Sequence, residues 1–110
     1  MRTIYRTPEF DKFLFEADSV LLKKVQYITE ILLTQKTINS KVAKKLTNTI
    51  LYEIRIQIAN EYRILTFAMD HEDISQANNI VFISCFMKKS TKDYQKEISK
   101  ALKILERWIE

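Results

Sequence analysis

Four basic residues in the second half of the chain are the groups best suited to chemistry. Arg55 and Arg63 lie in two segments with strand-like patterning, and Lys88 and Lys89 follow an apolar third segment. Rigid strands that bring several cations to one edge of a sheet suit an anionic ligand, and a phosphodiester backbone is the commonest ligand that needs several such contacts. The residues therefore point toward RNA.

The other reactive residue types carry weaker signals. His71 has no partner at metal or triad spacing, and it is interpreted as a solvated loop residue. Cys85 lies in the most apolar segment and is typical of a small buried hydrophobic residue. The chain contains no glycine, so a glycine-rich phosphate loop is excluded and turns must use Asn, Asp and Ser. No metal and no cofactor are predicted.

Length and composition favour one domain over residues 1–110. Hydrophobic residues make up 46% and charged residues 29% of the chain, which is a globular balance. The net charge of +4 permits nucleic-acid binding without demanding it. A single cysteine, the lack of a signal peptide and a longest apolar run of only Ile80 to Met87 predict a cytoplasmic protein with no membrane partner.

Hydrophobic periodicity predicts the elements that hold these residues. A short edge strand from Arg2 to Arg6 leads into a helical pair, with Thr7 as the cap and Pro8 in the first turn. Residues 39–48 are assigned to a short helix or an ordered loop. The change to a period of two then predicts strands at 50–58, 62–69 and 80–87, the last of them central, before a final helix at 91–109.

The predicted fold class is α+β in the order β-α-α-β-β-β-α, with the helices packed on one face of a small antiparallel sheet. Within it, Arg55 and Arg63 share a face only if the turn between them has an odd number of residues or a bulge. Ala59-Asn60-Glu61 is predicted as that turn, with Ile58 opposite Tyr62. Strict alternation in the third strand groups Phe82, Ser84, Phe86 and Lys88 against Ile83, Cys85, Met87 and Lys89, without deciding which lysine faces the site.

Three short motifs, in order along the chain, carry a family resemblance. Leu51-Tyr52-Glu53-Ile54-Arg55, Tyr62-Arg63-Ile64-Leu65 and Phe86-Met87-Lys88-Lys89-Ser90-Thr91 resemble segments of phage-derived HigB-like toxins of the RelE/ParE superfamily. The resemblance covers about residues 46 to 110, and the N-terminal half agrees only in pattern. It implies a RelE-like fold and the toxin of a type II toxin-antitoxin system.

The activity that this resemblance implies is a ribosome-dependent, metal-independent endoribonuclease, an mRNA interferase that cuts by 2′-hydroxyl attack and inhibits translation. The implied partners are the ribosome, mRNA and a HigA-like helix-turn-helix antitoxin, with which the toxin would form a hetero-oligomer. Two alternatives stay open. One is a ParE-like toxin that inhibits a protein target such as DNA gyrase, and the other is a catalytically silent partner that binds its antitoxin and regulates its operator.

The resemblance also implies roles for individual residues. Arg63, and after it Arg55, would hold the scissile phosphate, while Lys88 and Lys89 would supply a general acid or further phosphate contacts. The substrate-binding candidates are Tyr94, Glu53 and Tyr62. Each group also has an ordinary structural interpretation: strand arginines paired with Glu53 or Glu61, a solvated lysine pair, and a tyrosine in the stripe that the last helix buries.

Overall fold

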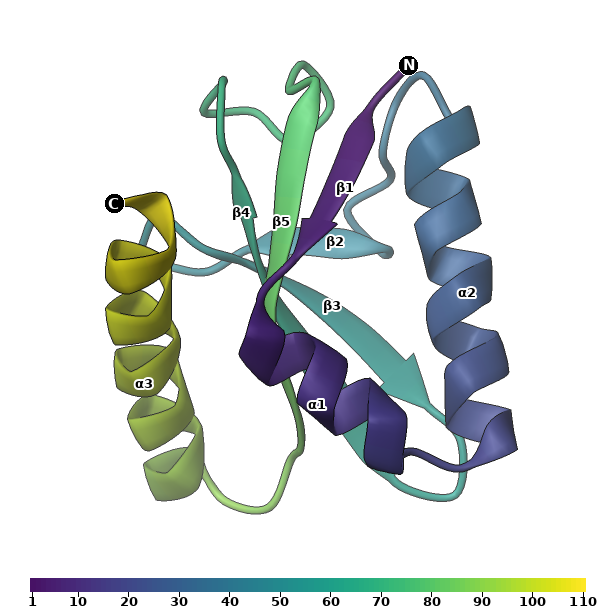
Figure 1. The fold of residues 1–110 in the computed structure, drawn as a ribbon, viewed down its shortest axis with the longest axis vertical. Helices are drawn as coiled ribbons and strands as arrows, with labels where there is room; N and C mark the ends of the chain where they lie inside the picture. Colours follow the sequence, from purple (N-terminus) through teal and green to yellow (C-terminus); the bar gives the residue numbers. More distant parts are fainter.

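The structure, a computed structural model, describes all 110 residues as a mixed sheet with two helices after its first strand and one after its last (Figure 1). The spatial order of the strands is β1-β5-β4-β3-β2, with β1 parallel to β5 and the other pairs antiparallel. The predicted α+β class is confirmed, but the sheet is mixed and not antiparallel as predicted, because β1 pairs with β5 in the parallel direction. None of the helices is a candidate for a transmembrane span. In chain order the elements are β1 (Thr3–Arg6), α1 (Pro8–Glu16), α2 (Ser19–Thr34), β2 (Ala43–Lys45), β3 (Tyr52–Gln57), β4 (Glu61–Ala68), β5 (Asn79–Met87) and α3 (Thr91–Ile109).

Side-chain caps start both N-terminal helices. Thr7 Oγ1 accepts a hydrogen bond from the Phe10 N–H at 3.1 Å, and the Asp18 carboxylate accepts one from the Leu21 N–H at 2.9 Å. Pro8 occupies the first turn of α1, where backbone N–H groups have no intrahelical partner, so the N–H that proline lacks is not needed. The predicted start of the helical pair is thus confirmed.

The helices cover both faces of the sheet, so the prediction that they pack on one face is wrong. Apolar residues of α1 and α2 share one core cluster with Ile54, Ile64 and Phe82. The buried stripe of α3 shares a second cluster with Leu65 and Val81, and Figure 1 shows α3 and α2 standing on opposite sides of the sheet. The physical reason is that β4 and β5 carry apolar residues at successive positions, and a sheet that is apolar on both faces must be covered on both.

Residues 39–48 contain an edge strand, β2, where a short helix or a loop was predicted. Ala43 is buried opposite Ile54, and the exposed Lys44 and Lys45 pair with β3 residues. The free edge of β3 offers backbone hydrogen bonds that a weak helical turn could not match. Asn48 then adopts a φ of 62°, which suits an asparagine in a chain without glycine.

The β3–β4 hairpin places Arg55 directly opposite Arg63, so the two arginines share a face. Three residues, Ile58-Ala59-Asn60, separate the last paired residues, Gln57 and Glu61. The predicted odd length is confirmed, but the turn lies one residue earlier than predicted, and Ile56 rather than Ile58 stands opposite Tyr62. The Glu61 carbonyl accepts the Lys88 N–H at 2.8 Å, and this pairing draws Glu61 into β4.

A β-bulge in β5 breaks the alternation predicted for that strand. Leu65 pairs with Ser84 but Thr66 pairs with Phe82, which leaves Ile83 as an extra residue. Phe82 and Cys85 therefore both pack toward α1 and α2, whereas Phe86 packs toward α3. The predicted face assignments beyond Ile83 are wrong for this reason. The strand predicted as central is interior but not in the middle, because β4 occupies that place.

Candidate functional site

Glu53 is the centre of a polar group that joins β3, β4 and α3. The side chain is only 4% exposed. Its Oε1 accepts a hydrogen bond from Arg55 Nε at 2.6 Å, its Oε2 lies 3.8 Å from Arg63 Nε, and it also accepts the hydroxyl hydrogen of Tyr94. A buried carboxylate is tolerated only with such compensation. The ion-pair interpretation of Glu53 therefore describes this structure.

The two arginines differ sharply in exposure. The Arg55 side chain is 59% exposed and the Arg63 side chain 3%. The hydrogen bond and charge of Glu53 raise the pKa of Arg55, so this guanidinium stays charged at every accessible pH. Arg55 can meet an incoming anion directly, and Arg63 lies behind it.

The Arg63 guanidinium is held by its own neighbours. Its Nη1 donates to the Tyr62 carbonyl at 3.1 Å, and its Nη2 lies 3.7 Å from the Glu61 carboxylate. Its Nε is buried without a hydrogen-bond partner. A buried donor without a partner is costly, so this nitrogen is a ready donor to any acceptor that reaches it.

Tyr94 links the site to the core. It lies in the first turn of α3, which is capped by Ser90, whose Oγ accepts the Asp93 N–H at 3.2 Å. Its ring meets the Phe86 ring edge-on, with centroids 5.6 Å apart, while its hydroxyl reaches Glu53. Tyr94 is therefore both a member of the predicted buried stripe and a partner of the polar group.

No side-chain hydrogen bond or ion pair links Lys88 or Lys89 to the arginine pair. Lys88 and Lys89 are both exposed after the end of β5. Lys89, with Phe86 and Tyr94, lines a cavity of about 490 Å³, but neither arginine lines it. The structure thus gathers Arg55 with Arg63, Glu53 and Tyr94, and it places Lys89 in the adjoining cavity.

Tyr62 lies on the other face of the sheet from Arg63. Its ring packs against Phe13 of α1, with centroids 6.2 Å apart, and it belongs to the cluster under α1 and α2. It is not part of the Glu53 group.

His71 is exposed and accepts only the Asp73 N–H, and no group of three His, Cys, Asp or Glu side chains could hold a metal ion.

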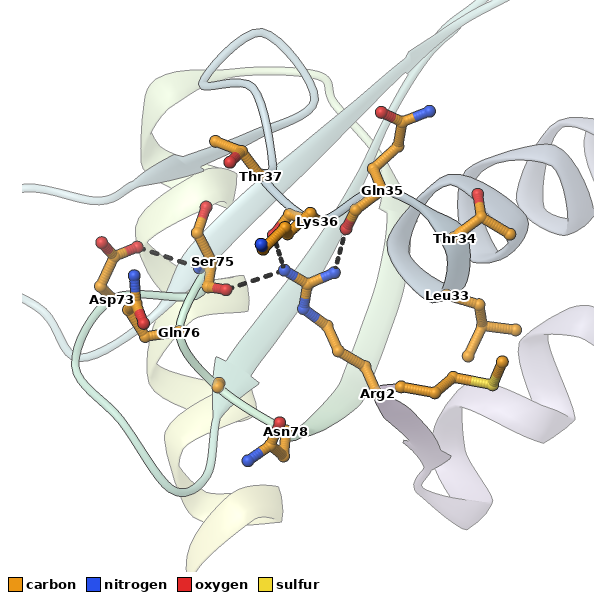
Figure 2. A pocket seen from close by; sticks show the side chains of 12 residues that line it. Arg2, Leu33, Thr34, Gln35, Lys36, Thr37, Asp73, Ser75, Gln76 and Asn78 are labelled. Carbon is orange, nitrogen blue, oxygen red and sulfur yellow. Dashed lines mark hydrogen bonds between the residues drawn. The ribbon is translucent and has the colours of Figure 1, made fainter.

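Arg2 lines a further cavity of about 570 Å³, surrounded mostly by polar residues, that the sequence did not reveal (Figure 2). The side chain is buried, and its guanidinium donates to the carbonyls of Leu32 at 2.9 Å, Lys36 at 2.7 Å and Ser75 at 2.8 Å, and also to Gln35. Carbonyls in the last turn of a helix lack intrahelical partners, and a cation there also complements the helix dipole. Arg2 therefore ties the end of α2 to the loop before β5. No spacing rule in the sequence could have found it.

Cys85 is expected to be inert while the protein is folded. Burial raises the pKa of its thiol to about 12, so almost no thiolate exists at neutral pH. Alkylation at pH 8 should be slower than in the urea-unfolded chain by on the order of 100-fold or more. The rate of iodoacetamide labelling, read by mass spectrometry, checks this. Equal labelling rates in the two states would contradict the burial of this thiol.

The architecture is that of the RelE toxins. A chain of the intact E. coli RelBE toxin-antitoxin complex is similar with a TM-score of 0.59 at 16% identity, covering 82% of this chain and 100% of that chain. The isolated E. coli RelE toxin is similar with a TM-score of 0.56 at 14% identity, covering 91% and 98%. At such identities the likeness concerns the fold.

The family follows from the sequence. Residues 12–106 match the family described as phage-derived protein Gp49-like, and the chain belongs to that family. No curated protein sequence matches it significantly. The predicted resemblance to phage-derived toxins of the RelE superfamily is confirmed.

Proposed function

We propose that this chain is the toxin of a type II toxin-antitoxin system and that it cleaves mRNA on the ribosome. The observation that carries the proposal is the direct pairing of Arg55 with Arg63 across the hairpin, with both guanidinium groups on one buried carboxylate. Two guanidinium groups at one end of a rigid sheet suit a phosphate that gains charge in a transition state.

The reaction that suits these groups is transfer within the RNA backbone. The ribose 2′-oxygen attacks phosphorus and gives up its proton, the P–O5′ bond breaks, and the leaving 5′-oxygen takes a proton. The products are a 2′,3′-cyclic phosphate and a 5′-hydroxyl. Glu53, which accepts hydrogen bonds from Arg55 and Tyr94 in the free protein, would accept the first proton, and Lys88 or Lys89 would donate the second.

Binding of the phosphate requires a rearrangement at Tyr94. Arg63 is 3% exposed and its Nε faces Glu53, so a phosphate reaches Arg55 first. Rotation of Tyr94 away from Glu53 would open the path to Arg63, whose unpartnered Nε then gains an acceptor. The cost of leaving that nitrogen unpaired in the free protein favours this exchange.

The partner in the proposed system is an antitoxin. The similar RelE-type chain was solved in a toxin-antitoxin complex, which supports a protein partner of the same class for this chain. We propose a HigA-like helix-turn-helix antitoxin, because the motifs around Arg55, Arg63 and Lys88 resemble HigB-like toxins. Binding of that antitoxin should silence the cleavage.

A translation extract tests the function. The purified chain should cut a reporter mRNA only when ribosomes are present, and primer extension should show discrete cuts in the reading frame. Supercoiling by DNA gyrase, measured in parallel, should be unaffected. If gyrase is inhibited and the mRNA stays intact, the chain has a ParE-like activity in place of the nuclease. If neither gyrase activity nor the mRNA is affected, the chain is the catalytically silent partner that binds the antitoxin.

A further inference from the structure

One face of α3 carries a line of cations that the proposed site does not use. Lys92, Lys96, Lys100, Lys103 and Arg107 are all exposed. At 100° per residue these positions fall within about 80° of one another around the helix axis, and they extend about 22 Å along it. We call these five residues the α3 basic stripe.

The stripe faces away from the sheet. Ile98, Ala101, Ile104 and Leu105 occupy the opposite side of α3 and are buried in its core cluster. No acidic residue of α3 falls inside the stripe, although Lys100 lies 3.9 Å from Glu97, and Arg107 pairs with Glu9 of α1 at 3.2 Å. Lys92, Lys96 and Lys103 form no ion pair, so their charges are free for an external partner.

We propose that the α3 basic stripe binds the phosphate backbone of base-paired RNA, separately from the strand that is cut. Successive cations lie about 4.5 to 6 Å apart along the axis, a density that can meet closely spaced phosphates. The inference rests on the proposed function only in naming RNA as the nucleic acid.

Two observations select this ligand. The groove between Lys96, Lys100 and Lys103 is lined only by polar and basic side chains, together with Gln95 and Ser99. A protein interface would need an apolar anchor at its centre, and the groove at the centre of the stripe has none, although Lys96 also lines the partly apolar cavity beside Phe86 and Tyr94. Single-stranded RNA would be held by aromatic stacking, yet Tyr94 and Trp108 turn toward the core. Backbone contacts to a duplex need neither feature.

A duplex on the stripe would lead toward the candidate site. The stripe starts at Lys92, in the same first turns of α3 as Tyr94, and Lys88 and Lys89 continue the positive charge toward the end of β5. Structured RNA bound along α3 would thus set the position of an unpaired strand that enters beside Arg55. Affinity and cleavage are then carried by different residues.

Charge removal on two sides of the protein tests this proposal. The variant Lys92→Gln/Lys96→Gln/Lys103→Gln loses three unpaired charges, and Lys12→Gln/Lys23→Gln/Lys24→Gln loses three exposed charges from α1 and α2. Fluorescence anisotropy with a blunt RNA duplex of about 16 base pairs measures binding. At about 100 mM salt the α3 variant should bind about tenfold or more weakly, with the log–log salt slope reduced by about 2 to 3. The control should change affinity by less than about twofold.

Each other outcome overturns the inference. Equal losses in the two variants would mean that only bulk charge matters, and an unchanged duplex affinity in the α3 variant would remove the site. Weakened antitoxin binding with unchanged duplex affinity would assign the stripe to a protein. Arg55→Ala separates this test from the proposed function, because it should keep duplex affinity while losing cleavage. If neither the wild type nor any variant cleaves mRNA, the nuclease proposal is wrong, but the proposed duplex binding by the α3 basic stripe is not affected.

Discussion

Replacing Arg63 with alanine is expected to lower the rate of ribosome-dependent mRNA cleavage by about 100-fold or more, the usual effect of losing one transition-state donor. Arg63 is nearly sealed from solvent, and its guanidinium donates to the Tyr62 carbonyl and lies 3.8 and 3.7 Å from the carboxylates of Glu53 and Glu61. A preorganised cation of this kind stabilises developing charge without reorganisation when the reaction occurs. Arg63→Lys keeps the charge but loses the planar fork, so it should recover little activity.

The control must separate chemistry from folding, because Arg63→Ala also removes one partner of the buried Glu53. Arg55→Ala meets this need, since Arg55 is 59% exposed and its removal leaves Glu53 with Arg63 and Tyr94. It too should lose most cleavage, while its melting temperature falls by less than that of Arg63→Ala, because only the hydrogen bond to Glu53 Oε1 is lost. Lys23→Ala, on the far side of the sheet, should change neither property. If Arg55→Ala and Arg63→Ala are both folded and both cleave mRNA at the wild-type rate, the proposed site is wrong.

Replacing Arg2 with alanine is expected to destabilise the fold by about 3 kcal/mol, because it removes charge-assisted hydrogen bonds and leaves buried carbonyls without donors. The guanidinium donates hydrogen bonds to the carbonyls of Leu32, Gln35, Lys36 and Ser75, and these bonds link the end of α2 to the loop before β5. For a chain of this size the melting temperature should fall by about 10 °C or more. Calorimetry or circular dichroism measures the change.

Arg6→Ala is the matched control. Arg6 pairs with Asp11 at 2.9 Å, and both side chains are about half exposed. Such surface pairs contribute at most about 1 kcal/mol. Arg2→Lys should lie between Arg2→Ala and wild type, because one ammonium cannot span the carbonyls that the guanidinium reaches. If the free energy of unfolding of Arg2→Ala lies within about 0.5 kcal/mol of that of wild type, the hydrogen bonds of Arg2 contribute little to stability.

Local patterns account for the elements that were predicted correctly. The apolar stripe of α3, the Thr7 cap with Pro8 and the two-residue period around Ile54 are each encoded within a few neighbouring residues. The shared face of Arg55 and Arg63 was also within reach, because turn parity alone decides it. These features depend on periodicities of the backbone that every such segment shares.

Features that depend on distant pairing were not predictable in the same way. β2 exists because the edge of β3 is available to it, and the turn shifted because Lys88 pairs with Glu61. The bulge at Ile83 reversed the parity of β5, and no residue there signals it. Tyr62 is next to Arg63 in the sequence, yet the pleat sends it to the opposite face.

The sequence by itself determined the class of fold, the positions of the helices and the set of cations available for an anionic ligand. Only the tertiary structure decided how those cations are used. Glu53 and Tyr94 meet although they are 41 residues apart, Arg63 is buried while Arg55 is exposed, and Arg2 reaches the end of α2. The physical reason is that burial and compensation of charge depend on which chain segments pack together, and local residue spacing does not contain that information.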